Sequence, residues 1–310
     1  MDRSNCRVHL YPSKRKQIMN KIKNTLLLAL ILLAGSASAQ ELPMPSPTST
    51  LTQRIGLTDI SITYSRPSMK GRMIWGDLVP MDKIWRTGAN KATKISFSND
   101  VKILEKPVAA GEYSVFTIPA DGIWTLILNS DLELWGTGDY DSLKDVLRVE
   151  LPVDVNPMQA ETMTFYFDNL SSDGGVLYLT WAELRIPIVI STNDHEIAMK
   201  NIEKAIAENE KNDYGPYINA ANYLNGKGMS KQAIEYAEKG VNLSDYWYAH
   251  WSLAKIYGDA QKWDDAVASA NMAKSKGMET YKEKGRDFSP YEKDIDKKIA
   301  QWKADKKAKK

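Results

Sequence analysis

The apolar pattern of this 310-residue sequence changes its period once, near residue 192. Between about residues 51 and 191, apolar and polar residues alternate in short runs, as in TMTFYFD (162–168). Alternation with a period of two is typical of strands that bury one face. After residue 192 the apolar residues recur at helical spacing instead. The sequence therefore predicts a β domain at about 51–192, followed by an α domain at about 193–305.

The β domain contains short strand candidates at nearly regular spacing, with no helical stretch between them. They are residues 57–64, 93–98, 112–118, 124–129, 145–151, 162–168, 175–181 and 184–190, with 101–104 as a further candidate. Asp121-Gly122 and residues 173–175 have the composition of hairpin turns. This arrangement predicts an antiparallel β-sandwich or barrel, and the pattern alone does not choose between the two.

Two segments of the α domain resemble each other at a spacing of 33 residues. Their alignment superposes three pairs of alanines: Ala221 on Ala254, Ala233 on Ala266, and Ala237 on Ala270. Small residues at these positions would let the two helices of a hairpin approach closely. The segments resemble tetratricopeptide repeats, which implies a stack of helical hairpins that offers a surface to a protein or peptide.

Two further helices are expected around these repeats. The first begins after a capping residue at Asn193 or Asp194. The last begins at Ser289-Pro290, with the serine as cap and the proline in the first turn. Its apolar stripe consists of Tyr291, Ile295, Ile299 and Trp302, and it is expected to close the stack ahead of a basic tail at 306–310.

The N-terminus has the pattern of a secretory signal peptide. A basic segment (14–24) precedes ten mostly apolar residues (25–34), and Ala37-Ser38-Ala39 offers a cleavage site of small residues. Ten apolar residues are too few to span a bilayer. We expect cleavage after Ala39 and a periplasmic or secreted protein, with Met1 or Met19 as the start and residues 40–50 as a flexible lead-in.

Export would change the charge and the redox chemistry of the chain. The full sequence has 41 Lys and Arg against 39 Asp and Glu, but seven of these basic residues and only one acidic residue lie in 1–39. The mature chain would therefore be slightly acidic, without the basic surface that nucleic-acid binding requires. Cys6, the one cysteine, would be lost, which excludes disulfides and cysteine ligands.

An unusually polar connection, residues 64–93, separates the first two strand candidates. It holds Arg66, Lys70, Arg72 and Arg86 together with Trp75, Trp85 and Asn90. Its pieces YSRPS, IWG and WRTGAN, with FTIP at 116–119, resemble the secreted bacterial domain-of-unknown-function family numbered 2911. The resemblance covers about 45–192 and implies a β domain, but no activity is established for that family.

The polar connection has two interpretations. In the first, it binds a small anionic or glycan-like ligand: arginine offers planar, bidentate donors to carboxylates and phosphates. The candidate binding residues are Arg66, Lys70, Trp75, Trp85, Arg86 and Asn90. In the second, the same side chains hold the fold together, with Asp59, Asp77 and Asp82 as ion-pair partners.

No catalytic signature stands out in the sequence. His195-Glu196 begins a zinc-protease motif, but Met199 occupies the position of its second histidine. No GxSxG, P-loop or GxGxxG motif occurs, and we expect neither a cofactor nor a metal. The sequence favours an exported, non-enzymatic binding or scaffold protein; the alternatives are an envelope hydrolase that uses the polar connection as its site, and a β domain that is purely structural.

Overall fold

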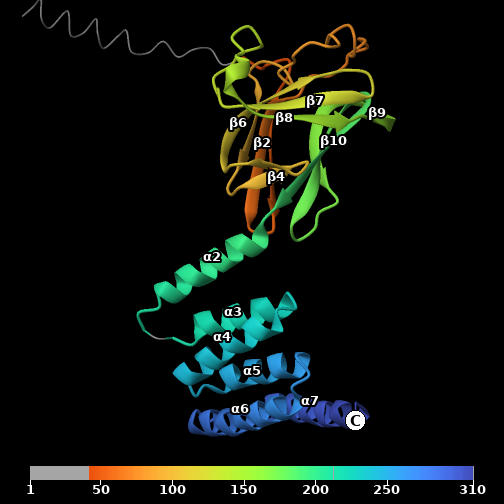
Figure 1. Cartoon of the computed structure of the whole chain (residues 1–310). Helices are drawn as coiled ribbons and strands as arrows, with labels where there is room; N and C mark the ends of the chain where they lie inside the picture. The colour runs from red at the N-terminus through yellow and green to blue at the C-terminus, as the bar shows by residue number, and fades with distance from the viewer. Residues whose placement is uncertain (1–41, 212, 310) are drawn as a thin grey trace, which may run out of the picture. The chain divides into compact units, whose positions relative to one another are not determined.

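A computed structural model describes residues 42–211 and 213–309 of the chain (Figure 1). The expected signal peptide and its cleavage point lie outside the described residues. Antiparallel sheets occupy residues 48–192, and six helices follow at 194–308. The predicted change from β to α structure near residue 192 is confirmed.

The β region consists of two sheets. The six-stranded sheet has the order β1-β2-β3-β6-β7-β8, and the four-stranded sheet has the order β5-β4-β10-β9. The bounds are β1 Thr48–Ile55, β2 Thr58–Ser65, β3 Thr93–Phe97, β4 Val101–Ile103, β5 Lys106–Val108, β6 Gly111–Ile118, β7 Ile123–Asn129, β8 Asp145–Pro152, β9 Asp154–Asp168 and β10 Gly174–Thr192. Every strand pair is antiparallel.

The core lies between the two sheets. Along β2 the residues Ile60, Ile62 and Tyr64 are buried, whereas the residues between them face outward. These side chains share one apolar cluster with Leu177 and Leu179 of the other sheet. Two sheets packed face to face in this way form a sandwich, so the first of the two predicted architectures is the observed one.

The strand β10 differs from its prediction. Residues 175–181 and 184–190 were expected as two strands, yet they form one strand that bends in the middle. Ala182 has a φ of 51°, and the pairing with β9 shifts register on both sides of it. A bulge at one residue lets the strand turn without ending, and an alternation pattern cannot distinguish this from a short loop.

The strands β1 and β5 and the first half of β9 were not predicted. β1 begins at Thr48, inside the segment expected to be a lead-in, and most of its residues are exposed or half-buried. The first half of β9, from Asp154 to Glu161, is similarly exposed. Edge and protruding strands bury little on either face, so they carry no clear apolar alternation.

The helical part contains two hairpins. Its helices are α2 Asp194–Ala207, α3 Gly215–Gly226, α4 Ser230–Leu243, α5 Trp247–Asp259, α6 Trp263–Glu283 and α7 Ser289–Ala308. The helices α3 and α4 form the first hairpin, and α5 and α6 form the second. All six alanines of the predicted repeat are fully buried: Ala221, Ala233, Ala237, Ala254, Ala266 and Ala270. The close approach of helices inferred from their small size is therefore confirmed.

The last helix packs against the second hairpin through Ile295, Ile299 and Trp302, which are buried. It begins at Ser289 with Phe288 in the capping position, so the predicted cap at Ser289 is wrong by one residue. The carboxylate of Asp287 accepts the hydrogen bond from the Ser289 amide at 2.9 Å. An acidic side chain outside the helix thus does the work expected of the serine.

The contact between α7 and α5 depends on Gly258. A Cβ atom at this position would lie 2.4 Å from the Trp302 indole. Gly226 lies at the exposed end of α3, and a Cβ atom added there would have no other atom within 4 Å. The two glycines therefore differ in what an added methyl group would meet.

We predict that Gly258→Ala lowers the free energy of unfolding of the helical part by about 1–3 kcal/mol, because Trp302 must move to make room. Gly226→Ala is the control and should be neutral or stabilising by up to about 1 kcal/mol, since alanine is the better helix former. Urea unfolding followed by helical circular dichroism measures both. Equal effects of the two substitutions would contradict the close contact.

Candidate functional site

The connection from β2 to β3 is tied to the second sheet by Arg66. Its Nε donates to the carbonyl of Met163 at 3.2 Å, and its Nη2 donates to Thr164 Oγ1 at 2.7 Å. Ser68 bonds Thr162 at 2.9 Å just beyond it. The guanidinium of Arg66 is therefore engaged by β9, and its observed contacts are those of a side chain that joins two segments of the fold.

Both tryptophans of the connection enter the core between the sheets. Trp85 is stacked on Trp181 with ring centres 6.1 Å apart, and Trp75 meets Trp124 edge-on at 4.9 Å. The indole of Trp85 also donates to the carbonyl of Gly88 at 3.1 Å. Aromatic pairs of this kind contribute about 0.5–1.5 kcal/mol beyond their buried area. The connection is thereby anchored in the sandwich.

The turn after Trp85 has an unusual backbone. Thr87 is buried with a φ of 50°, a conformation that is rare for a β-branched residue. Its carbonyl accepts a 2.6 Å bond from Thr93 Oγ1, and its hydroxyl donates to Thr117 Oγ1 at 3.2 Å. Such strain costs on the order of 1–3 kcal/mol and persists only where the surroundings impose it.

Gly88 and Asn90 complete this turn. Gly88 has a φ of 158°, and a Cβ there would lie 3.1 Å from Thr93 Oγ1. Asn90 has a φ of 60°, which asparagine tolerates better than most residues, and its amide donates to Ser65 Oγ at 3.2 Å. Asn90 thus joins the turn to the end of β2.

Arg86 is different from Arg66. Its Nε is buried without a hydrogen-bond partner, and the guanidinium forms no ion pair with any described residue. Burial lowers the pKa of the Arg86 guanidinium below its usual value. Asp59 pairs with Arg54 instead, and neither Asp77 nor Asp82 forms an ion pair in the described part of the chain. The expected pairing of these aspartates with the arginines is not observed.

Arg86 points away from the tryptophan cluster. The backbone of Trp85 pairs with that of Thr117 in β6, and the ring of Trp85 lies in the core. The neighbouring residue Ile84 instead packs with Phe116 on the outer face of the six-stranded sheet. Side chains alternate along an extended segment, so Arg86 shares the outer face with Ile84. The register places Ile127 beside Phe116 and Arg148 beside Ile127 on that face.

A polar network lies on the same outer face, and the sequence analysis did not identify it. Tyr140 packs on Phe116 and donates to the Asp145 carboxylate at 2.7 Å. Arg148 donates to Asp145 at 2.7 Å and to the Tyr140 hydroxyl at 2.9 Å. Burial, and then the bond to Asp145, raise the pKa of Tyr140. The three residues lie within nine positions of one another, but no sequence motif marks them: a short helical turn at Ser142–Lys144 and the register shift between Asp145 and Leu147 separate them in the chain.

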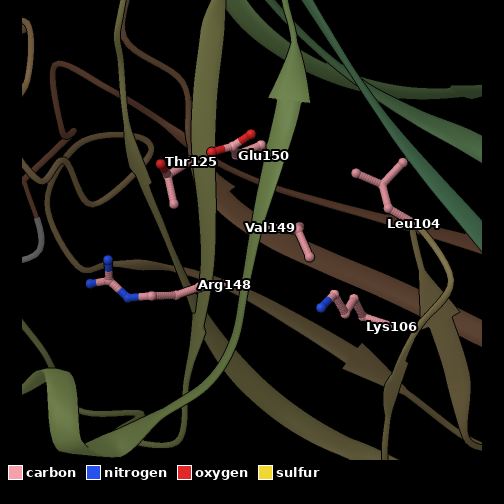
Figure 2. A pocket seen from close by; sticks show the side chains of 6 residues that line it. All are labelled: Leu104, Lys106, Thr125, Arg148, Val149 and Glu150. Carbon is pink, nitrogen blue, oxygen red and sulfur yellow. The ribbon is translucent and has the colours of Figure 1, made fainter.

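A hollow of about 490 Å³ lies along β8 (Figure 2). It is lined by Leu104, Lys106, Thr125, Arg148, Val149 and Glu150. Figure 2 shows that Arg148 and Val149 extend to opposite sides of the β8 ribbon. The hollow therefore follows the edge of a strand, and none of the six residues predicted to bind a ligand lines it.

The six predicted site residues do not form a single polar cluster. Trp75 and Trp85 lie in the core, and Arg66 and Asn90 bond to strands. Lys70 is exposed, and its backbone amide donates to Glu161 at 2.9 Å. Arg86 alone presents a guanidinium without a protein partner among the described residues. If the connection binds a ligand, Arg86 is the residue whose geometry suits that role.

The first helices of the two hairpins carry a second polar surface. Asn225 of α3 donates to Asp259 of α5 at 2.7 Å. On α5 the ammonium of Lys255 lies 5.7 Å from the ring centre of Tyr248 and 5.8 Å from that of Trp251. Tyr248 is 40% exposed, and Lys255 forms no ion pair within the described residues. The surface thus combines an exposed ring with a positioned positive charge.

Neither a metal centre nor a membrane-spanning helix is found in the described part of the chain. Residues 42–211 and 213–309 contain no group of three or more His, Cys, Asp or Glu placed to hold a metal ion. None of the helices within these ranges combines the length and apolarity needed to cross a bilayer. His195, the first residue of the incomplete zinc-protease motif, contacts the hydroxyl of Tyr223 through its Nδ1 at 3.2 Å.

Two family models match the chain, one over the β region and one mainly over the helices, and the two matches overlap at residues 182–190 within β10. Residues 46–190 match the model of a family described as "Protein of unknown function (DUF2911)". Residues 182–300 match the model of the family "ChAPs (Chs5p-Arf1p-binding proteins)", a family of helical repeats. No curated protein matches the chain. The resemblance stated for the β domain and the repeat character of the helices are both confirmed.

One buried histidine gives the helical part a pH dependence. His250 is 8% exposed, its Nε2 has no hydrogen-bond partner, and Asp245 Oδ1 lies 3.8 Å away. Burial lowers the pKa of His250, with Asp245 opposing this shift and Lys276 adding to it. The unfolded chain therefore takes up a proton at a higher pH than the folded protein does. Stability from this group is complete above the unfolded pKa of about 6.5 and is lost as the pH falls toward the folded value.

We predict that the free energy of unfolding of the helical part falls between about pH 7.5 and about pH 5.5, and that His250→Gln reduces this fall. Urea unfolding at each pH measures it. His195→Gln is the control and should leave the pH dependence of the wild type in place. An unchanged slope in the His250 variant would show that other groups cause the acid sensitivity.

Proposed function

We propose that this chain, which joins a β domain of the DUF2911 type to a helical repeat array, is an exported, non-enzymatic scaffold that docks an acidic protein segment on its helices. The proposal rests mainly on Lys255. Its ammonium group lies over the rings of Tyr248 and Trp251 and forms no ion pair with a carboxylate in the described chain. The family that the helical segment matches is described as a family of binding proteins, which supports this role. Export rests on residues 1–39 of the sequence.

The chemistry of the surface defines its partner. Stacked helical hairpins present extended faces that commonly bind peptides. Lys227, Lys239 and Lys262 also lie over aromatic rings, and none of them forms an ion pair in the described residues. A ring beneath an ammonium group holds it in place without neutralising its charge. A segment that carries carboxylates beside an apolar or aromatic side chain would meet both groups.

The test uses the exported full-length protein, whose intact mass also reports whether cleavage occurs after Ala39. A library of displayed peptides is selected on this protein, and we predict that the selected peptides are rich in Asp and Glu. Lys255→Gln should weaken their binding roughly tenfold, the equivalent of about 1.4 kcal/mol. Lys303→Gln, an exposed lysine on α7, changes the net charge equally and should leave binding unchanged. Peptides without acidic residues, or equal losses in both variants, would reject the proposal.

A second binding role is proposed for the β domain, because Arg86 has no protein counter-ion in the described residues. A half-buried guanidinium without a partner is destabilising, and a small carboxylate or phosphate would supply the missing acceptors. Phosphate and succinate are suitable probes. Arg66 provides the comparison, since its guanidinium is already bonded to β9.

We predict opposite effects of the two arginines on stability. Arg66→Met should cost on the order of 2 kcal/mol, because it removes two hydrogen bonds from a charged donor. Arg86→Met should leave the melting temperature unchanged or raise it, and it should abolish any rise caused by added phosphate or succinate. Thermal unfolding with and without each anion measures both effects. A large loss of stability in Arg86→Met would show that this side chain supports the fold and would reject the ligand role.

A further inference from the structure

The strand β8 leaves one edge of the six-stranded sheet open. It pairs with β7, and no other described strand pairs with it. The amide of Val153 donates to the carbonyl of Gly122 at 3.2 Å, which fixes the phase of the ladder. Odd-numbered residues of β8 therefore bond to β7, and the even-numbered residues turn their backbone groups toward the open edge. The open edge carries Val146, Arg148, Glu150 and Pro152.

Both the sequence and the surroundings of this edge are consistent with that phase. Pro152 has no backbone N–H, and proline in a sheet is confined to positions that face an open edge or a bulge. The hollow of about 490 Å³ runs along β8, with Leu104 and Lys106 of the other sheet facing Val149 across it (Figure 2). The strands β5 and β10 lie close to β8, and the hollow separates Leu104 and Lys106 from the centre of the strand.

We propose that this edge pairs with the same edge of a second copy of the chain. In an antiparallel arrangement with Val149 opposite Val149 of the second copy, Arg148 lies opposite Glu150 of the second copy, and Glu150 opposite its Arg148. The pairing is symmetric, so each interaction occurs twice. Opposite charges facing each other across two strands stabilise the pair, and like charges destabilise it.

The alternation of β8 agrees with this register on both faces. Leu147, Val149 and Leu151 are buried on the core side of the sheet. In the proposed register Leu147 lies opposite Leu151 of the second copy, so apolar residues meet apolar residues. The exposed side holds the charged pairs. Two neighbouring β-sheets would join into one continuous sheet of the dimer.

Other symmetric registers are unfavourable. A shift of the two strands by two residues places either Arg148 opposite Arg148 or Glu150 opposite Glu150, and both arrangements face like charges. A shift by one residue places even-numbered residues opposite odd-numbered ones, whose N–H and C=O groups point toward β7 and not toward the second copy. It also brings charged residues opposite buried ones. Among the registers that pair the centre of β8, the proposed one alone faces opposite charges in the correct backbone phase.

The two charged residues are prepared for this contact in different ways. Arg148 is held by Asp145 and Tyr140 through its Nε and Nη2, which fixes the guanidinium on the outer face of the sheet. Glu150 forms no ion pair or hydrogen bond through its side chain in the described chain. Charged residues and proline on an edge also serve to prevent pairing. The oligomeric state distinguishes these two roles of the charged residues. An edge that only prevents pairing leaves the protein monomeric, whereas a self-complementary edge forms a dimer.

The experiment measures the mass of the full-length exported protein by analytical ultracentrifugation over a range of concentrations. We expect a monomer–dimer equilibrium for the wild type. Glu150→Arg should weaken dimer formation by at least roughly tenfold, since it places arginine opposite arginine. Arg148→Glu should do the same by placing glutamate opposite glutamate. Lys303→Gln is the control and should dimerise as the wild type does.

Mixing the two charge variants separates the proposal from damage to the fold. An Arg148→Glu chain and a Glu150→Arg chain offer opposite charges to each other at both positions, so an equimolar mixture should form a heterodimer although each alone is monomeric. Circular dichroism of each variant reports its fold independently. A wild-type protein that is monomeric at all concentrations, a dimer that persists in Glu150→Arg, or a mixture of folded variants that remains monomeric would each overturn the proposal.

Discussion

The packing of four tryptophans between the two sheets determines how the β domain is built. Trp124 and Trp181 belong to opposite sheets and are almost completely buried. Trp75 and Trp85 come from the connection between β2 and β3 and contact both of them. A long polar connection is thereby fixed to the core at two points. Its polar side chains must then be arranged around that constraint.

This constraint explains most of the polar residues in the connection. Once Trp85 is buried, the chain must reverse immediately, and Thr87 adopts its strained backbone while bonds to Thr93 and Thr117 hold it. Arg66 and Asn90 bond to β9 and to the end of β2. Arg86 lies on the opposite face, where no described residue neutralises it. Arg66 and Asn90 therefore fit the structural interpretation, and the ligand-binding role that we propose rests on Arg86.

In the helical part, small residues at the contacts between helices determine how closely the helices approach each other. Its six repeat alanines are buried, and Gly258 and Gly277 face Trp302 and Phe288 at distances that leave no room for a methyl group. Large aromatic residues then fill the remaining space and reach the surface at Tyr248 and Tyr291. The exposed rings and the lysines beside them are the groups on which the proposed docking of an acidic segment rests. In the β domain, by contrast, the proposed contact with a second copy is made by the edge of β8.

The sequence alone determined those features that depend on local periodicity. The change at residue 192, most of the strands and the buried repeat alanines follow from apolar spacing, because burial of one face imposes the period on the chain. It failed where burial is weak or the pattern is interrupted: at β1, at the start of β9, and at the bulge of Ala182.

Only the tertiary structure decided which polar side chains find partners. Arg66 and Arg86 look equivalent in the sequence, yet one is bonded to β9 and the other is unpaired among the described residues. The pairing of β8 with β7 at the end of the six-stranded sheet, which sets the facing of Arg148 and Glu150, likewise depends on strand register. Register and facing are set by contacts between distant segments. A spacing of apolar residues along the chain carries no information about them.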